Sequence, residues 1–97
     1  MKTILVVEDD RVYARVVANW LVKNGLEARY VLSVASAKEF IAGTEVGLVL
    51  SDYRLQDGNG VELLEWMKAN GYRMPFFIMT GYGCLLYTFD AADDLLC

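Results

Sequence analysis

Residues 46–60 have the sequence VGLVLSDYRLQDGNG, and this stretch decides the fold class. It begins with an apolar run, residues 46–50, that is typical of a strand buried on both faces. Ser51 and Asp52 follow at once, and the turn-rich residues 57–60, DGNG, come soon after. A charge directly after a buried strand is costly unless it has a function. The stretch therefore predicts a strand of a parallel sheet whose polar end carries chemistry, followed by a turn with no direct catalytic role.

The rest of the chain alternates strands and helices around this segment. A second apolar run, TILVV, ends in three acids, and Asp10 is a good cap for a helix that stops at Asn24. The only proline, Pro75, stands just before another apolar strand, where a sheet tolerates it. The pattern predicts a doubly wound α/β fold with a parallel sheet between helices. The predicted strands are 3–7, 27–32, 46–50 and 76–79, and the predicted helices follow Asp10, Ser33 or Ser36, and Gly60.

Length and composition exclude several function classes. The chain has 97 residues and a net charge of −4, without a basic patch, so we expect neither direct nucleic-acid binding nor membrane binding. The first apolar run is too short for a signal peptide, which favours a cytoplasmic protein. The absence of histidine excludes Ser-His-Asp and Cys-His nucleophile pairs, and Cys84 and Cys97 lack metal-site spacing.

Four polar residues follow the predicted strands where the chemistry of an open α/β sheet is expected. Polar sites in such sheets lie beyond the carboxyl ends of the strands, which brings Glu8, Asp9, Asp52 and Thr80 to one edge. Three neighbouring carboxylates stay ionised together only if a cation neutralises them, and an all-oxygen set suits Mg²⁺. A carboxylate can also act as the nucleophile toward phosphorus, forming an acyl phosphate. We therefore expect a magnesium-assisted phosphoryl site with Asp52 as the acceptor.

Three segments, in this order and at these separations, resemble the motifs of a bacterial response-regulator receiver domain, the CheY-like domain of two-component signalling. They are ILVVEDD at 4–10, LSDYRLQDGNG at 50–60 and IMTGYG at 78–83. The resemblance covers residues 1–83 and implies a flavodoxin-like fold. It also implies a phosphoacceptor domain rather than an enzyme.

The family pattern assigns roles to individual residues. It implies that a sensor histidine kinase, or a phosphotransfer protein, phosphorylates Asp52. Glu8 and Asp9 would form the acidic pocket, and Mg²⁺ would be bound by Asp9, Asp52 and the backbone carbonyl of Arg54, with Glu8 acting through a water. Thr80 would be the switch hydroxyl that reports phosphorylation. The output module of this family lies downstream of the receiver, and residues 79–83 resemble those of regulators with ATPase-type transcriptional output. We therefore expect a DNA-binding transcriptional output module.

The last fourteen residues depart from the family. A receiver continues with a fourth helix, a fifth strand that ends in a lysine, and a fifth helix, and residues 84–97 do not match them. Residues 84–94 resemble a translated sequencing adapter, although 91–95 can also be read as a shortened form of the family passage before the fifth strand. The spacing of apolar residues in this tail predicts a helix over 84–96. Without a fifth strand, residues 76–79 would form an open edge, which predicts a homodimer.

Three other function classes compete with this interpretation. An Mg²⁺-dependent aspartyl phosphohydrolase needs a second acid two residues after its nucleophile, where this chain has Arg54. A dinucleotide-binding module needs a glycine-rich turn after the first strand, where acids stand instead. A receiver-like interaction or dimerisation fragment that is never phosphorylated stays open, and only a phosphorylation test separates it from a working receiver.

Overall fold

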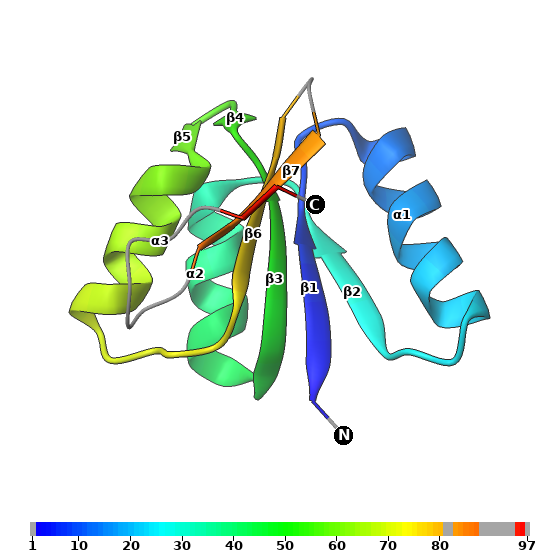
Figure 1. Ribbon diagram of the computed structural model, residues 1–97, viewed down its shortest axis with the longest axis horizontal. Helices are drawn as coiled ribbons and strands as arrows, with labels where there is room; N and C mark the ends of the chain where they lie inside the picture. Colours follow the sequence, from blue (N-terminus) through cyan, green and yellow to red (C-terminus); the bar gives the residue numbers. More distant parts are fainter. Residues whose placement is uncertain (1, 81–82, 88–94, 97) are drawn as a thin grey trace.

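The chain forms a twisted sheet with helices on both faces (Figure 1). The computed structural model describes residues 2–80, 83–87 and 95–96. The strands of the main sheet have the order β2-β1-β3-β6-β7-β8, and the first four are parallel. Their bounds are β1 Thr3–Val7, β2 Ala28–Val31, β3 Val46–Asp52, β6 Phe76–Thr80, β7 Gly83–Tyr87 and β8 Leu95–Leu96. A short hairpin of β4, Arg54–Leu55, and β5, Gly58–Asn59, follows β3.

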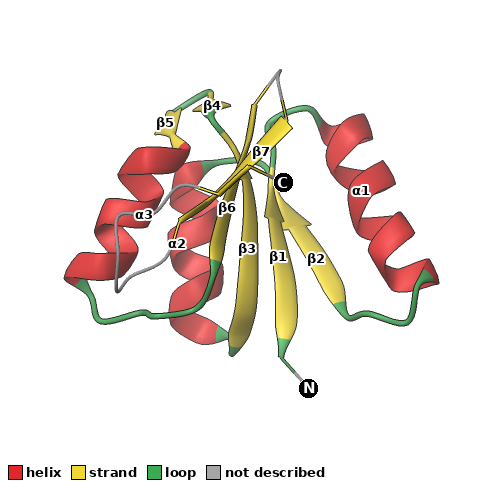
Figure 2. Ribbon diagram, in the orientation of Figure 1, coloured by secondary structure: helices red, strands yellow, loops and turns green. Residues whose placement is uncertain are grey.

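Three helices cover the sheet unequally, as Figure 2 shows. The helix α1, Arg11–Lys23, packs alone on one face, whereas α2, Val34–Gly43, and α3, Gly60–Ala69, pack together on the other. The larger core lies on the α2 and α3 side and includes Leu5 and Phe76, while the smaller core under α1 includes Val6. Among the described residues, no helix combines the length and apolar character that a bilayer crossing requires.

Side-chain caps set the start of each helix. Asp10 accepts hydrogen bonds from the backbone N–H groups of Val12 and Tyr13 and so begins α1, as expected from the sequence. Ser33 caps α2 through the N–H of Ser36, and Asn59 caps α3. These caps satisfy amide groups that have no partner within their own helix. They fix where the chain leaves each strand and therefore which residues remain at the polar edge of the sheet.

The expected α/β fold and the flavodoxin-like parallel order are confirmed for the first four strands. β1 has the predicted bounds, and β3 runs two residues further than expected, through Asp52. The expected turn at 57–60 contains the tip and second strand of the β4–β5 hairpin, which was not predicted, and the first residue of α3. These differences are small because the buried strands carry the strongest sequence signal.

Two expectations for the end of the chain are wrong. Residues 84–87 are not helical, because they belong to β7, which pairs antiparallel with β6. Leu95 and Leu96 form β8 rather than the end of a helix, and residues 88–94 lie outside the described part. The edge of β6 is therefore covered by this chain, and the dimer expected through it loses its basis. An apolar strand with unpaired backbone groups gains more from a neighbouring strand than from a helix, which leaves those groups unpaired.

The start of α3 approaches the end of β3 so closely that only glycine fits at position 60. A Cβ atom at Gly60 would lie 2.9 Å from the backbone oxygen of Asp52 and 3.2 Å from Oγ of Ser51. Ser51 is fully buried, so the chain has little room to yield. We expect Gly60→Ala to lower the free energy of unfolding by about 1–3 kcal/mol, measured by urea denaturation.

The matched control is Gly43→Ala, at the end of α2, where an added Cβ would meet nothing within 4 Å. This control is expected to be neutral, or stabilising by up to about 1 kcal/mol, because alanine favours the helix. Equal stability of the Gly60→Ala variant and the wild-type protein would show that the close approach is not required.

Candidate functional site

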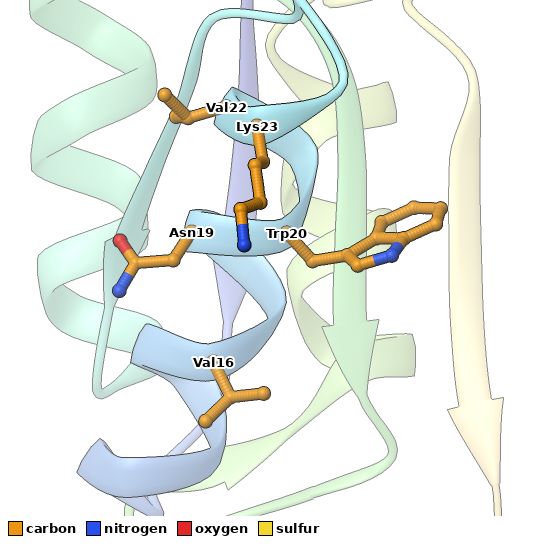
Figure 3. Close-up of a pocket in the computed structure, with 5 residues that line it drawn as sticks. All are labelled: Val16, Asn19, Trp20, Val22 and Lys23. Atoms are coloured by element: carbon orange, nitrogen blue, oxygen red, sulfur yellow. The ribbon is translucent and has the colours of Figure 1, made fainter.

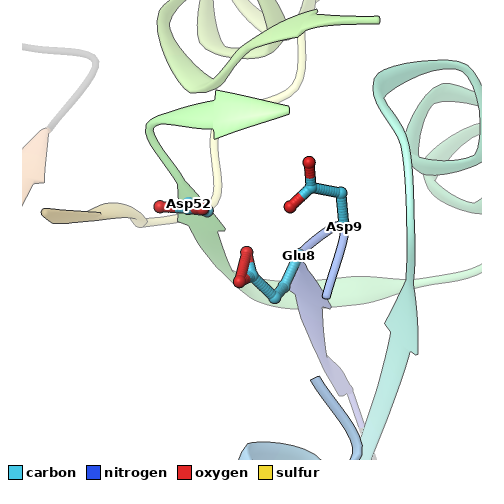
Figure 4. Close-up of side chains that lie close together, drawn as sticks. All are labelled: Glu8, Asp9 and Asp52. Atoms are coloured by element: carbon cyan, nitrogen blue, oxygen red, sulfur yellow. The ribbon is translucent and has the colours of Figure 1, made fainter. Parts of the chain in front are cut away.

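Three carboxylates meet at the carboxyl edge of the sheet, as Figure 4 shows, and we call Glu8, Asp9 and Asp52 the acidic triad. One oxygen from each side chain lies within 4.8 Å of the others. The arrangement follows from the parallel register of the two central strands, because Val7 at the end of β1 lies opposite Ser51 of β3. The next residue along each strand is a triad acid. The sequence prediction that these three acids converge is thus met by the geometry.

Glu8 is the buried member of the triad. Its side chain is only 7% exposed, and its Oε2 has no hydrogen-bond partner in the described structure. Its backbone N–H donates to the carbonyl of Val31, which holds it at the junction of β1 and β2. Burial, the largest cause, together with the neighbouring carboxylates of Asp52, Asp9 and Asp10, raises the pKa of Glu8 to about 8. Without a cation, the site therefore keeps a proton on Glu8 at neutral pH.

Asp52 stands at the last position of β3, half-buried, between two other strands. Its Oδ1 accepts a hydrogen bond of 2.9 Å from the backbone N–H of Tyr53. Its backbone oxygen accepts a 2.9 Å hydrogen bond from the hydroxyl of Ser51. In the register of β3 with β6, Asp52 lies opposite Met79. The backbone around the carboxylate is thus fixed on both sides, while the side chain lies at the polar edge.

The remaining predicted site residues are Thr80 and Arg54, and neither belongs to the acidic triad. The backbone of Thr80 ends β6, one residue beyond Met79, so it is at the same edge of the sheet as Asp52. Arg54 lies in β4, two residues beyond Asp52, and its side chain is exposed. The expected convergence of the strand ends therefore holds for the backbone at Thr80. The roles of Thr80 and Arg54 toward a metal or a phosphoryl group stay predictions.

Asp57, near the site but outside the triad, makes a contact that the sequence interpretation missed. It lies at the tip of the β4–β5 hairpin, and its carboxylate accepts hydrogen bonds from the N–H groups of Val34, at 2.8 Å, and Ala35, at 3.0 Å. These bonds lower the pKa of Asp57. The partners lie more than twenty residues earlier in the chain, so no local pattern indicates the contact.

The donor set of the acidic triad fits a hard divalent cation. All of its side-chain donors are carboxylate oxygens, which are the ligands that Mg²⁺ and Ca²⁺ prefer. A buried carboxylate oxygen without a partner is unusual in a folded protein, and Glu8 Oε2 supplies one at the base of the site. A cation held there directly, or through a water, would satisfy this oxygen and offset the repulsion among the acids.

A hollow of about 500 Å³ lies elsewhere, on the outer surface of α1 (Figure 3). It is lined by Val16, Asn19, Trp20, Val22 and Lys23. Trp20 is 63% exposed, and the lining includes no acid and no member of the triad. This hollow is large, but its lining lacks the carboxylates that a phosphoryl site needs, so the acidic triad is the candidate reactive site.

The sequence of this chain matches one family model and several characterised regulators. Residues 4–94 match the model described as response regulator receiver domain. The photosynthetic apparatus regulatory protein RegA of Rhodobacter capsulatus is 26% identical over 84 residues, which are 87% of this chain and 46% of RegA. The response regulator protein PilR of Pseudomonas aeruginosa is 30% identical over 81 residues, 84% of this chain and 18% of PilR. The chain thus spans less than half the length of these relatives.

Solved structures show the same fold. The MaeR response regulator bound to beryllium trifluoride has a TM-score of 0.76 and 32% identity, covering 84% of this chain and 68% of the MaeR chain. A CheY-like receiver domain from Methylobacillus flagellatus has a TM-score of 0.78 and 25% identity, covering 84% of this chain and 70% of its own. The family-model match extends through residue 94, beyond the residue 83 at which the motif resemblance ends.

The raised pKa of Glu8 predicts how stability depends on pH when no divalent cation is present. Between pH 4.5, its unfolded pKa, and about 8, the folded protein keeps a proton on Glu8 that the unfolded chain releases. The folded state therefore binds more protons, and stability falls as the pH rises through this window. We expect a loss of at least about 1 kcal/mol, measured by urea denaturation in EDTA.

The matched variant is Glu8→Gln, which keeps the size of the side chain and cannot ionise. Its stability should vary less over the same pH window, and Mg²⁺ should stabilise it less than it stabilises the wild-type protein. An identical pH dependence in the two proteins would contradict the assignment of this titration to Glu8.

Proposed function

The chain belongs to the response regulator receiver domain family, and on that premise we propose that Asp52 accepts a phosphoryl group from a histidine kinase or a phosphotransfer protein. The observation that carries the proposal is the acidic triad, in which the buried and unpartnered Glu8 Oε2 stands beside Asp52 at the end of the central strands. Burying a carboxyl group without a hydrogen-bond partner costs stability. Such costs are typical of functional sites. We expect a signalling phosphoacceptor rather than an enzyme that turns over a substrate.

The transfer needs a nucleophile and a way to limit charge repulsion. A carboxylate oxygen of Asp52 would attack the phosphorus of a phosphohistidine, forming an O–P bond as the P–N bond breaks and the electron pair returns to the imidazole. The backbone N–H of Tyr53 holds the carboxylate in orientation through Oδ1. A phosphoryl dianion approaching three acids would be repelled. Bound Mg²⁺ would supply the positive charge that neutralises the acids and the transferring group.

The residues of the site divide these tasks between them. Asp9 and Asp52 would bind the Mg²⁺ directly, Glu8 would bind it through a water, and the backbone carbonyl of Arg54 would complete the protein ligands. The exposure of Asp9 and the burial of Glu8 support this division, because Mg²⁺ dehydrates reluctantly and keeps several waters. Thr80, at the end of the neighbouring strand β6, would hydrogen-bond the phosphoryl group after transfer.

Relatives support the phosphoacceptor proposal. The structure of MaeR contains beryllium trifluoride, which on a carboxylate oxygen has the tetrahedral shape of a phosphoryl group. The transcriptional regulatory protein FixJ of Bradyrhizobium diazoefficiens is 44% identical to this chain over 43 residues. We propose that the phosphorylation state of this domain controls a transcriptional, DNA-binding output module elsewhere in the regulator, while the domain itself does not contact nucleic acid.

Phosphorylation can be tested by intact mass after incubation with Mg²⁺ and acetyl phosphate, a small phosphodonor. We expect one phosphoryl adduct on the wild-type chain, lost on adding EDTA before the donor and absent in Asp52→Asn. The matched control is Asp10→Asn, which changes an acid near the triad to another good helix cap and should leave the adduct in place.

An adduct that persists in Asp52→Asn would refute the assignment of the acceptor. No adduct on a wild-type chain that circular dichroism shows to be folded would instead favour the alternative, a receiver-like interaction module that is never phosphorylated.

Thr80→Ala should separate phosphoryl transfer from the response to it. The rate of adduct formation should change less than about tenfold, because the nucleophile and the metal ligands remain. The shifts of backbone amide resonances in β6 that accompany phosphorylation or beryllium trifluoride binding should shrink, because the hydroxyl that reaches the group is gone. Full-sized shifts in β6 of the variant would remove Thr80 from the proposed switch.

A further inference from the structure

The β4–β5 hairpin, residues 54–59, joins the phosphoacceptor strand to α3 and carries Arg54 close behind Asp52. Its two ends are fixed by backbone contacts. The N–H of Gly60 donates to the carbonyl of Tyr53 at 2.9 Å, and Arg54 pairs with Asn59 across the hairpin. These contacts close the base of the hairpin, but they do not fix the direction in which its tip points. The tip needs a contact of its own if the whole hairpin, which follows β3 and Asp52 directly, is to be held in one orientation.

The tip is held against the start of α2, an element that contributes nothing to the acidic triad. The Asp57 carboxylate accepts the N–H groups of Val34 and Ala35, one on each oxygen, at 2.8 and 3.0 Å. Gly58 lies so near that an added Cβ would be 3.2 Å from a methyl group of Val34. Leu55, from the same hairpin, is buried in the core shared with α2 and α3. One charged contact and one apolar contact thus attach the tip to α2.

The helix does not depend on Asp57 alone for its cap. Ser33 already occupies the N-cap position of α2 and accepts the N–H of Ser36 at 3.1 Å. Asp57 takes two further amides of the first turn, with a negative charge at the positive end of the helix. The α2 helix already has a local cap, and the contact with Asp57 comes from a residue more than twenty positions later in the chain. This contact therefore attaches the hairpin to the helix as well as stabilising the helix.

We propose that Asp57 is a positioning residue for the phosphoacceptor site: it clamps the β4–β5 hairpin to α2 and so holds the segment that follows Asp52, including the backbone of Arg54. The consequence for metal binding rests on the function proposed above. The clamp itself does not, because it concerns the hairpin with or without a cation. Asp57 makes no contact with a reacting group in this scheme, and it acts through the backbone that it holds.

The test compares Asp57→Ala with Ser33→Ala, a matched variant that removes a cap bond from the same helix but does not touch the hairpin. Both variants should lose stability to urea. Only Asp57→Ala should raise the amide hydrogen-exchange rates across residues 53–60, measured by NMR without metal. Only Asp57→Ala should weaken the binding of Mn²⁺, measured by electron paramagnetic resonance, by about tenfold, the lower end of what loss of an outer-shell partner costs.

Two further measurements separate positioning from general damage. The Mg²⁺ concentration that half-saturates the rate of phosphorylation by acetyl phosphate should rise in Asp57→Ala, with a near wild-type rate at saturating Mg²⁺. Asp57→Asn, whose side-chain oxygen can still accept a backbone N–H, should restore much of the metal affinity, and it provides a folded variant if the alanine variant is unstable.

The possible results test the clamp by Asp57 and the proposed phosphoacceptor function separately. Equal exchange rates and equal Mn²⁺ affinity in Asp57→Ala and Ser33→Ala would overturn the clamp and leave Asp57 as a second helix cap. A wild-type chain that binds no Mn²⁺ and forms no adduct would refute the proposed function. In that case, hydrogen exchange across residues 53–60 would still decide whether Asp57 holds the hairpin.

Discussion

The structure depends on offsetting one cost, which is that of holding three acidic side chains together, one of them buried, at the carboxyl edge of β1 and β3. The two strands are central neighbours in the sheet, and the parallel register of Val7 with Ser51 brings Glu8 and Asp52 together. Folding must therefore bury Glu8 against two other acids. The apolar residues of β1 and β3, packed on helices from both sides, supply the favourable free energy that offsets this cost.

The order of the elements explains why this edge of the sheet is open to a ligand. The chain leaves β1 for β2 on one side and then returns to β3 on the other, so the loops after β1 and β3 separate at the edge where the acids lie. Open sheets bind their ligands at this switch point because no crossover helix covers it. The short hairpin after β3 lies at the same edge, and its attachment to α2 extends the site to residues outside the central strands.

Much of this architecture could be predicted from the sequence. The parts that could not be predicted have a common physical cause. The buried strands and the acids that follow them are local signals, because an apolar run and the residue after it are adjacent in the chain. The contact of Asp57 with Val34 depends on how α2 and the hairpin pack, which no local pattern encodes. The helix expected over 84–96 was wrong at 84–87, because the open edge of β6 was expected to pair with another chain, whereas β7 of this chain adds to it.

The unequal covering of the two faces of the sheet also bears on how the protein opens. The α1 helix rests on a small core and leaves Val12 and Trp20 largely exposed, and its neighbours are the strands just before and just after it. The core on the other face joins β1, β3 and β6 to α2 and α3. Partial unfolding should begin where the fewest apolar contacts are lost, which is at α1. Because β1 and β3 stay packed on α2 and α3 during such an opening, the acids remain together even while one side of the sheet is open to water.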